Sequence, residues 1–186
     1  MSDQNNQAAR RAKKEAWLRA IYERHLGQFR ATGDMAPIAI ARSTHLAMDA
    51  LLEQDRENSA DSENIRCGKG CSHCCHGPVE IGPQEAVLLV EVMQQTGITP
   101  DVARLERQGR HTVESWREQP AADQACVFLG EDQACTVYES RPDACRKLLV
   151  MSDPRHCDAA QGTTDQIDRW FSWEAEMMAS AALEVY

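Results

Sequence analysis

The sequence predicts a mainly α-helical protein with one small β-hairpin, built as a helical scaffold around a cysteine-rich metal-binding module. Apolar residues recur every three or four positions over several long stretches, which is the period of a helix. Residues 126–138 instead carry two short β-prone runs separated by a loop with glycine. Eight cysteines, well above what packing in a 186-residue chain requires, all lie after residue 66.

Two amphipathic helices are expected before the first cysteine. One runs from about residue 8 to 32 and ends at Gly33, and the second begins near Pro37 and runs to about residue 55. His45 lies on the apolar face of the second helix, where a histidine is more often a core residue than a ligand. Residues 57–66 have no apolar period and are interpreted as a linker. We therefore divide the chain into an N-terminal helical arm, residues 1–60, and a cysteine-cluster metal-binding domain, residues 61–186.

Further helices are expected around the cysteines. Gly82-Pro83 opens an apolar helix that Gly97 closes, and Thr99-Pro100-Asp101 supplies the start of another, which should reach about Arg117. A final helix is expected from about Asp165, carrying Ile167, Trp170, Phe171, Met178 and Ala181.

The hairpin of residues 126–138 should bring two thiols together. CVFL and ACTVY are separated by GEDQ, and a period of two places Cys126 with Phe128 on one face and Cys135 with Val137 on one face of the partner strand. In the following SRPDACRK, Pro142 should fix a turn that places Cys145 near the start of a short helix, a position that favours the thiolate. Arg141 should bond to backbone carbonyls or a carboxylate as a supporting residue.

The first four cysteines have spacings of four, three and one. If they were all helical they would fall within an arc of about 100°, but Gly68 and Gly70 favour a tight loop that enters a helix near Cys71. Thiolates brought this close raise one another's pKa unless a cation is present, and a metal ion deprotonates and holds them. The expected metal is Zn²⁺ or iron, and the iron could be a [4Fe-4S] cluster. The predicted metal ligands are Cys67, Cys71, Cys74, Cys75, Cys126, Cys135, Cys145 and Cys157.

The adjacent pair Cys74 and Cys75 limits how these ligands are shared. Neighbouring residues do not easily point at one tetrahedral ion, so one of the two should belong to another site or be spare. Two closed four-thiolate sites, or one site with free or redox-paired thiols, both remain open. His73 and His76 lie between the cysteines and could each replace a thiolate.

Composition limits the partners. The chain shows no secretory signal, so a reducing, cytoplasmic location is expected, in which clustered cysteines bind metal more often than they form disulfides. No apolar run approaches the roughly 20 residues that cross a bilayer. The net charge of −9 opposes binding to nucleic acid or anionic lipid. A metal ion is the expected partner, and any protein partner is unidentified.

The segments CGKGCSHCC and CVFLGEDQACTVYESRPDACR resemble the YkgJ-type cysteine-cluster family, a zinc- or iron-chelating domain, over about residues 67–157. The family pattern is C-x3-C-x2-C-C, then C-x-x-L, then C-x-x-Y-x-x-R-P-x-x-C-R. The positions that match its second part are Cys126, Leu129, Cys135, Tyr138, Arg141, Pro142, Cys145 and Arg146. The resemblance implies metal binding and specifies no reaction.

Two functions follow. The first is a non-catalytic metal protein with a structural, chelating or metal-handling role. The second is an iron–sulfur protein with redox or S-adenosylmethionine-related activity, because C-x3-C-x2-C is the spacing of three cluster ligands in radical enzymes of that class and flagellin lysine methylases carry a similar cluster. The chain lacks the βα alternation and glycine-rich segment that such enzymes use, and H-E-x-x-H is absent, so a non-enzymatic role is favoured.

Overall fold

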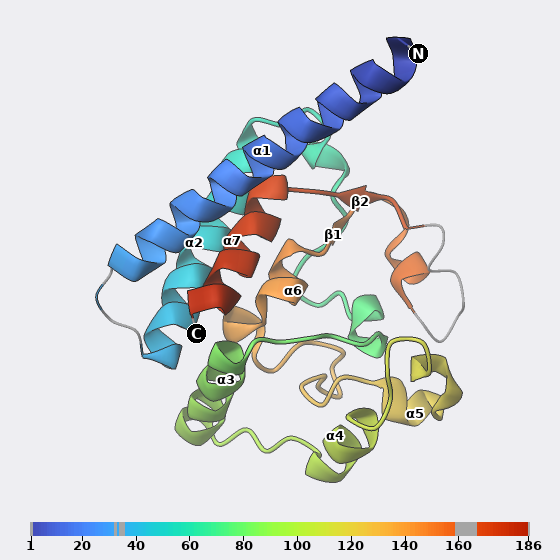
Figure 1. The fold of residues 1–186 in the computed structure, drawn as a ribbon. Coiled ribbons are helices and arrows are strands. Elements are labelled where there is room, and N and C mark those ends of the chain that lie inside the picture. Colours follow the sequence, from blue (N-terminus) through green and yellow to red (C-terminus); the bar gives the residue numbers. More distant parts are fainter. Residues whose placement is uncertain (1, 32, 34–35, 159–166, 186) are drawn as a thin grey trace.

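The computed structural model describes residues 2–31, 33, 36–158 and 167–185, and it is mainly helical, as predicted. The long helix α1 (Ser2–Ala31) packs against the C-terminal helix α7 (Trp173–Val185), which also packs against α2 (Pro37–Glu57) (Figure 1). The remaining helices are α3 (Pro83–Thr96) and the shorter α4 (Val102–Gln108), α5 (Ala121–Gln124) and α6 (Asp143–Lys147). Single turns of 3-10 helix connect them: η1 (Ser62–Asn64), η2 (His73–His76), η3 (Trp116–Glu118), η4 (Tyr138–Ser140) and η5 (Pro154–Cys157).

The hydrophobic core lies where α1, α2 and α7 meet. Three alanines of α7 are completely buried there, and their small side chains let the neighbouring helices approach closely. The strands β1 (Leu149–Val150) and β2 (Arg169–Trp170) each contribute one residue to this core, Leu149 and Trp170. The buried core residues are Leu26, Phe29, Met48, Leu52, Leu149, Trp170, Ala175, Met178, Ala181 and Ala182.

The first three predicted helices are confirmed. Gly33 follows the end of α1, Pro37 is the first residue of α2, and Gly97 ends α3 with a left-handed φ of 73°. The start of α3 is fixed by Glu85, whose Oε2 accepts a hydrogen bond of 2.8 Å from the backbone N–H of Gly82. This carboxylate also accepts the backbone N–H of Asp143, the first residue of α6, as described below.

The predicted small two-stranded antiparallel sheet exists, but it lies elsewhere in the chain. Strands β1 and β2 pair Leu149 with Trp170 and Val150 with Arg169. In residues 126–138 a single isolated bridge joins Leu129 to Cys135. Local β-propensity was therefore enough to make this segment turn back on itself, but not to form regular strands.

Two predicted helix boundaries are wrong. The final helix begins at Trp173, after Trp170 has entered β2, where its backbone pairs across the chain with Leu149. Its expected start at Asp165 lies outside the described residues. Helix α4 ends at Gln108, well before Arg117, because the buried Gln108 amide donates to the carbonyls of Asp123 and Ala125 and the chain turns back there.

Among the described helices, none is both long enough and apolar enough to cross a membrane.

The central packing of α2 gives a direct test of this core. Replacing Met48, which is 0% exposed, by alanine should lower the free energy of unfolding by about 2–5 kcal/mol, because it leaves a cavity between α2 and α7. Leu46 lies two residues earlier and is 74% exposed, so Leu46→Ala should change stability by less than about 0.5 kcal/mol. Urea unfolding measures both, and equal losses would show that the core is placed incorrectly.

Candidate metal centre

Most of the predicted ligands line one cavity. Its volume is about 950 Å³, and its walls also include Tyr138 and Arg141. Cys157 lines a neighbouring cavity that shares Cys74 with the first. All eight cysteines are free thiols. The thiols on the first cavity are Cys67, Cys71, Cys74, Cys75, Cys126, Cys135 and Cys145.

The first run of cysteines is folded by a tight turn and one short helix. Gly70 has a left-handed φ of 92°, which lets the chain reverse so that the N–H of Cys71 bonds to the carbonyl of Gly68 at 3.1 Å. The expected helix near Cys71 is instead η2, which contains Cys74 and Cys75. The backbone N–H of Cys126 donates to the carbonyl of Cys75 at 2.7 Å, which joins the first run to the distal cysteines.

Backbone N–H groups point at three of the sulfur atoms. The N–H of Val150 donates to Cys67 Sγ at 3.2 Å. Cys126 accepts from the N–H of Phe128, and Cys135 accepts from the N–H of Val137, in each case two residues further on. Such bonds lower the pKa of a thiol and stabilise the thiolate that a metal ion requires.

Helix α6 presents Cys145 as predicted. Pro142 precedes the helix, and the N–H of Cys145 bonds to its carbonyl at 2.9 Å. The prediction for Arg141 is confirmed: its Nη1 donates to the carbonyl of Tyr138 at 2.9 Å, and its guanidinium lies 4.1 Å from the centre of the Tyr138 ring. Arg141 therefore supports the turn before Cys145.

Arg146 holds the same turn from the other side and is only 2% exposed. Its Nε donates to the carbonyl of Arg141 at 2.9 Å, and its terminal nitrogens donate to the carbonyl of Glu139 and to Asp49 of α2. One buried guanidinium thus connects α2 to the turn that carries Cys145.

Burial and mutual repulsion raise the pKa of the clustered thiols. Burial raises the pKa of Cys145 to about 12, with Cys74, Cys126 and Cys135 adding to the rise, so the prediction that the start of α6 favours the thiolate is wrong. Burial raises the pKa of Cys157 to about 11, with Cys74, Cys67 and Cys71 adding to it. A hydrogen bond with Cys75, followed by burial, raises the pKa of Cys74 far above its usual value.

These interactions divide the thiols into two groups. Cys67, Cys71 and Cys157, here called the Cys157 group, lie near one another and near Cys74, because Cys71 and Cys74 add to the rise that burial causes in the pKa of Cys67 and of Cys157. Cys126, Cys135 and Cys145, here called the Cys145 group, form a second set that also borders Cys74. Cys74 therefore lies between the two groups, with Cys75 beside it.

The donor set fits zinc or iron, since both metals bind thiolate sulfur. In the described part of the chain, however, no three thiols have sulfur atoms that all lie within 4.8 Å of one another. A Zn–S bond of about 2.3 Å places tetrahedral sulfurs about 3.8 Å apart, so the thiols would draw together around a single ion. Among the histidines, Nδ1 of His76 is buried and has no hydrogen-bond partner among the described residues.

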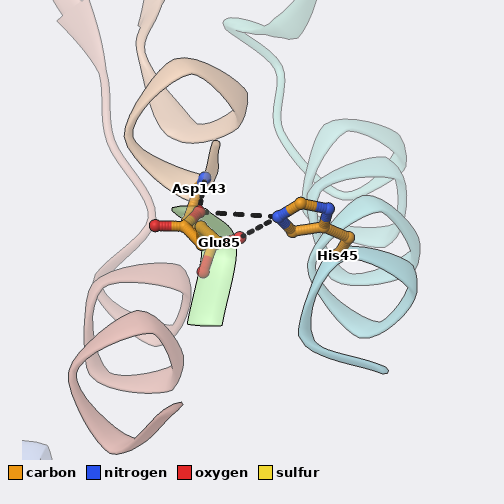
Figure 2. A group of neighbouring side chains, drawn as sticks. All are labelled: His45, Glu85 and Asp143. Atoms are coloured by element: carbon orange, nitrogen blue, oxygen red, sulfur yellow. Dashed lines mark hydrogen bonds and ion pairs between the residues drawn. The ribbon is translucent and has the colours of Figure 1, made fainter. Parts of the chain in front are cut away.

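A buried group beside the thiols was not predicted as a unit. His45, Glu85 and Asp143 come from α2, α3 and α6, and each is at most 6% exposed. Figure 2 shows the His45 ring nitrogen facing both carboxylates, 3.5 Å from Glu85 Oε1 and 3.6 Å from Asp143 Oδ1. Glu85 Oε1 also accepts the backbone N–H of Asp143 at 2.6 Å, so it caps the helix that carries Cys145.

The two carboxylates of this group have opposite pKa shifts. Burial alone would raise the pKa of Glu85, but hydrogen bonds from His45 and from the N–H groups of Asp143 and Gly82 outweigh it and lower the pKa. Burial, together with the nearby charge of Glu85, raises the pKa of Asp143 to about 6. Glu85 is thus the carboxylate that the fold holds ionised.

Comparison with known proteins identifies the cysteine-bearing region. Residues 66–169, more than half of the chain, match the CxxCxxCC family model, described as "Putative zinc- or iron-chelating domain". The chain belongs to this family. The match includes all eight cysteines and excludes α1 and α2. No curated protein and no solved structure matches the chain.

The capping role of Glu85 can be tested in this CxxCxxCC protein. Glu85→Gln should lower the free energy of unfolding at neutral pH by about 1–3 kcal/mol, because buried N–H groups lose their charged acceptor. Since the folded pKa of Glu85 is lowered, its contribution is complete above the unfolded value of about 4.3 and is lost as the pH falls. The difference between wild type and variant should therefore narrow on acidification.

Glu91→Gln is the matched control. Glu91 lies on the same helix in a more exposed ion pair with Arg42, so its replacement should cost less than about 0.5 kcal/mol. Equal losses for the two variants, or a difference that does not narrow at low pH, would contradict the role assigned to Glu85.

Proposed function

We propose that this protein binds zinc or iron through its eight cysteines and has a non-catalytic role in structure, chelation or metal handling. The observation that carries the proposal is convergence: thiols from separate segments, including the first run, the 126–135 turn and α6, line one cavity. A small domain gains most when metal ligation connects segments that are distant in sequence.

The grouping of the thiols supports two metal positions. The Cys157 group and the Cys145 group each contribute three sulfurs, Cys74 borders both groups, and Cys75 lies beside Cys74. Each group then becomes a four-thiolate site when it takes one member of the adjacent pair. Two neighbouring residues can ligate two different ions more easily than they can both point at one ion.

A second candidate is an iron–sulfur protein with redox or S-adenosylmethionine-related activity. Two observations favour it: the thiols are spaced more widely than a single tetrahedral zinc ion requires, and the cavity of about 950 Å³ is comparable to pockets that hold small molecules. A cluster would supply electron transfer, and the cysteines would hold it.

The remaining features of the proposal concern location and partners. A reducing cytoplasmic compartment would keep the thiols available, and the net charge of −9 disfavours nucleic acid and anionic membranes as partners. Residues 1–60 would serve as a helical arm that supports the cysteine-cluster domain of residues 61–186.

Serine substitutions with metal analysis test the two-position arrangement. Wild-type protein purified without oxygen should carry about two equivalents of zinc or iron, and Cys145→Ser or Cys157→Ser should each remove about one and lower the melting temperature. Cys74→Ser and Cys75→Ser should each remove about one equivalent, because each position takes one member of this pair. Thr136→Ser is the control, because this exposed neighbour of Cys135 keeps its hydroxyl bond to the Phe128 carbonyl and should retain full metal content.

Two outcomes would contradict the proposal. If wild type holds less than about one-tenth equivalent of any transition metal and its thiols are paired as disulfides, the protein is not a metal protein. If Cys126, Cys135 and Cys145 variants keep full metal and stability while only residues 67–75 matter, a local C-x3-C-x2-C site replaces the shared arrangement. An absorption spectrum with the charge-transfer bands of an iron–sulfur cluster would favour the second candidate.

A further inference from the structure

The buried group of His45, Glu85 and Asp143 has the composition of a metal site of its own. One nitrogen and two carboxylates from three different helices lie within 4.8 Å of one another, and all are at least nine-tenths buried. Asp143 Oδ1 has no hydrogen-bond partner among the described residues, although it is buried. These features alone are compatible with a bound divalent cation or with a hydrogen-bonded network among the three side chains.

The contact of the other ring nitrogen of His45 distinguishes a cation site from a hydrogen-bonded group without metal. Arg146 Nη2 lies 3.2 Å from His45 Nδ1. A guanidinium can only donate, so Nδ1 must accept and carries no proton. In a neutral imidazole the proton is then on Nε2, the nitrogen that faces Glu85 and Asp143.

This arrangement is the reverse of the one that metal-binding histidines use. A histidine that ligates through one nitrogen normally donates its other N–H to a carboxylate or a carbonyl. Here the second nitrogen meets a donor, and the Nε2 lone pair that a metal ion would need is occupied by a proton.

We infer that His45 is a positioning residue: Arg146 fixes its tautomer, and its Nε2–H points at Glu85 and lies beside Asp143 without a metal ion. Glu85 in turn accepts the N–H of Asp143, and Arg146 holds the carbonyls of Glu139 and Arg141. The group therefore fixes both ends of the turn into α6. Given the proposed role of Cys145 as a ligand, His45 acts on the metal centre through α6, from a helix outside the matched family region.

Nitrogen NMR of the histidine rings in full-length, ¹⁵N-labelled protein tests the tautomer, with assignment by loss of the signal in His45→Gln. The expected result is a protonated Nε2 and an unprotonated Nδ1, in protein as isolated and after treatment with a chelator. A protonated Nδ1, or a metal-bound Nε2 that gains its proton on chelation, would overturn the inference. This measurement does not depend on whether the cysteines bind metal, so its failure is distinct from that of the proposed function.

The positioning role is tested by metal release to a chromophoric chelator under native conditions. His45→Leu should keep the wild-type metal content but release metal about 10- to 100-fold faster, as expected when a supporting partner of a ligand is removed. His45→Gln, which keeps an N–H donor near the position of Nε2, should restore slow release. His25→Gln is the control, since His25 is equally buried but lies between α1 and Glu174 of α7.

Two other outcomes of the release experiment would overturn the inference. Loss of a whole metal equivalent in His45→Gln or Asp143→Asn, with the cysteines unchanged, would show a second metal site and overturn the inference. A His45→Leu protein that is less stable but releases metal at the wild-type rate would show a purely structural role and would also overturn it. If His45→Leu does not fold, the NMR result and the release rate of Asp143→Asn, expected to stay near that of wild type, decide the question.

Discussion

The structure depends on how a set of partly buried thiols is kept close together. Burial and neighbouring sulfurs raise the pKa of Cys145 and of Cys157, so the charged forms of these thiols are unfavourable without a cation. A metal ion reverses this situation, because it displaces the protons and turns repulsion among thiolates into shared ligation. The free energy of metal binding would then also stabilise the folds of the segments that carry the ligands.

Those segments contain little regular structure, so specific contacts must hold them. The backbone N–H bonds to Cys67, Cys126 and Cys135 satisfy buried donors and direct the sulfurs at the same time. Two buried charged residues hold the neighbouring helices in place: Glu85 caps both α3 and α6, and Arg146 connects the turn before α6 to α2. The helical scaffold is therefore part of the metal centre's support, although its own side chains are not the predicted ligands.

Much of the scaffold could be predicted because its signals are local. The apolar period and the punctuation by Gly33, Pro37 and Gly97 fix α1, α2 and α3 to within a few residues, apart from the earlier start of α1. The start of α7 could not be predicted, because Trp170 fits a helical period yet pairs with Leu149, a contact that depends on tertiary structure. The location of the sheet also could not be predicted from local sequence. Residues 126–138 have a high propensity for strands but form one isolated bridge, and the regular antiparallel pairing is between β1 and β2.

Part of the candidate site could likewise be predicted from sequence, and part could not. Spacing and resemblance predicted which cysteines gather, and the structure brings seven of them to one cavity. The contacts of Glu85 with Asp143 and of His45 with Arg146 join residues 58 and 101 positions apart, which a sequence pattern does not reveal. A partial signal existed in Glu85 itself, which lies three residues after Gly82 at the start of an apolar helix, as a capping residue does.

The central claim is that cysteine sulfur holds the metal, and X-ray absorption at the zinc or iron edge of the protein as isolated tests it most directly. The account predicts a first shell made of sulfur at about 2.3 Å, with about four sulfurs for each metal ion. A first shell dominated by nitrogen or oxygen at about 2.0–2.2 Å would contradict it, because the metal would then lie outside the cysteine cavity.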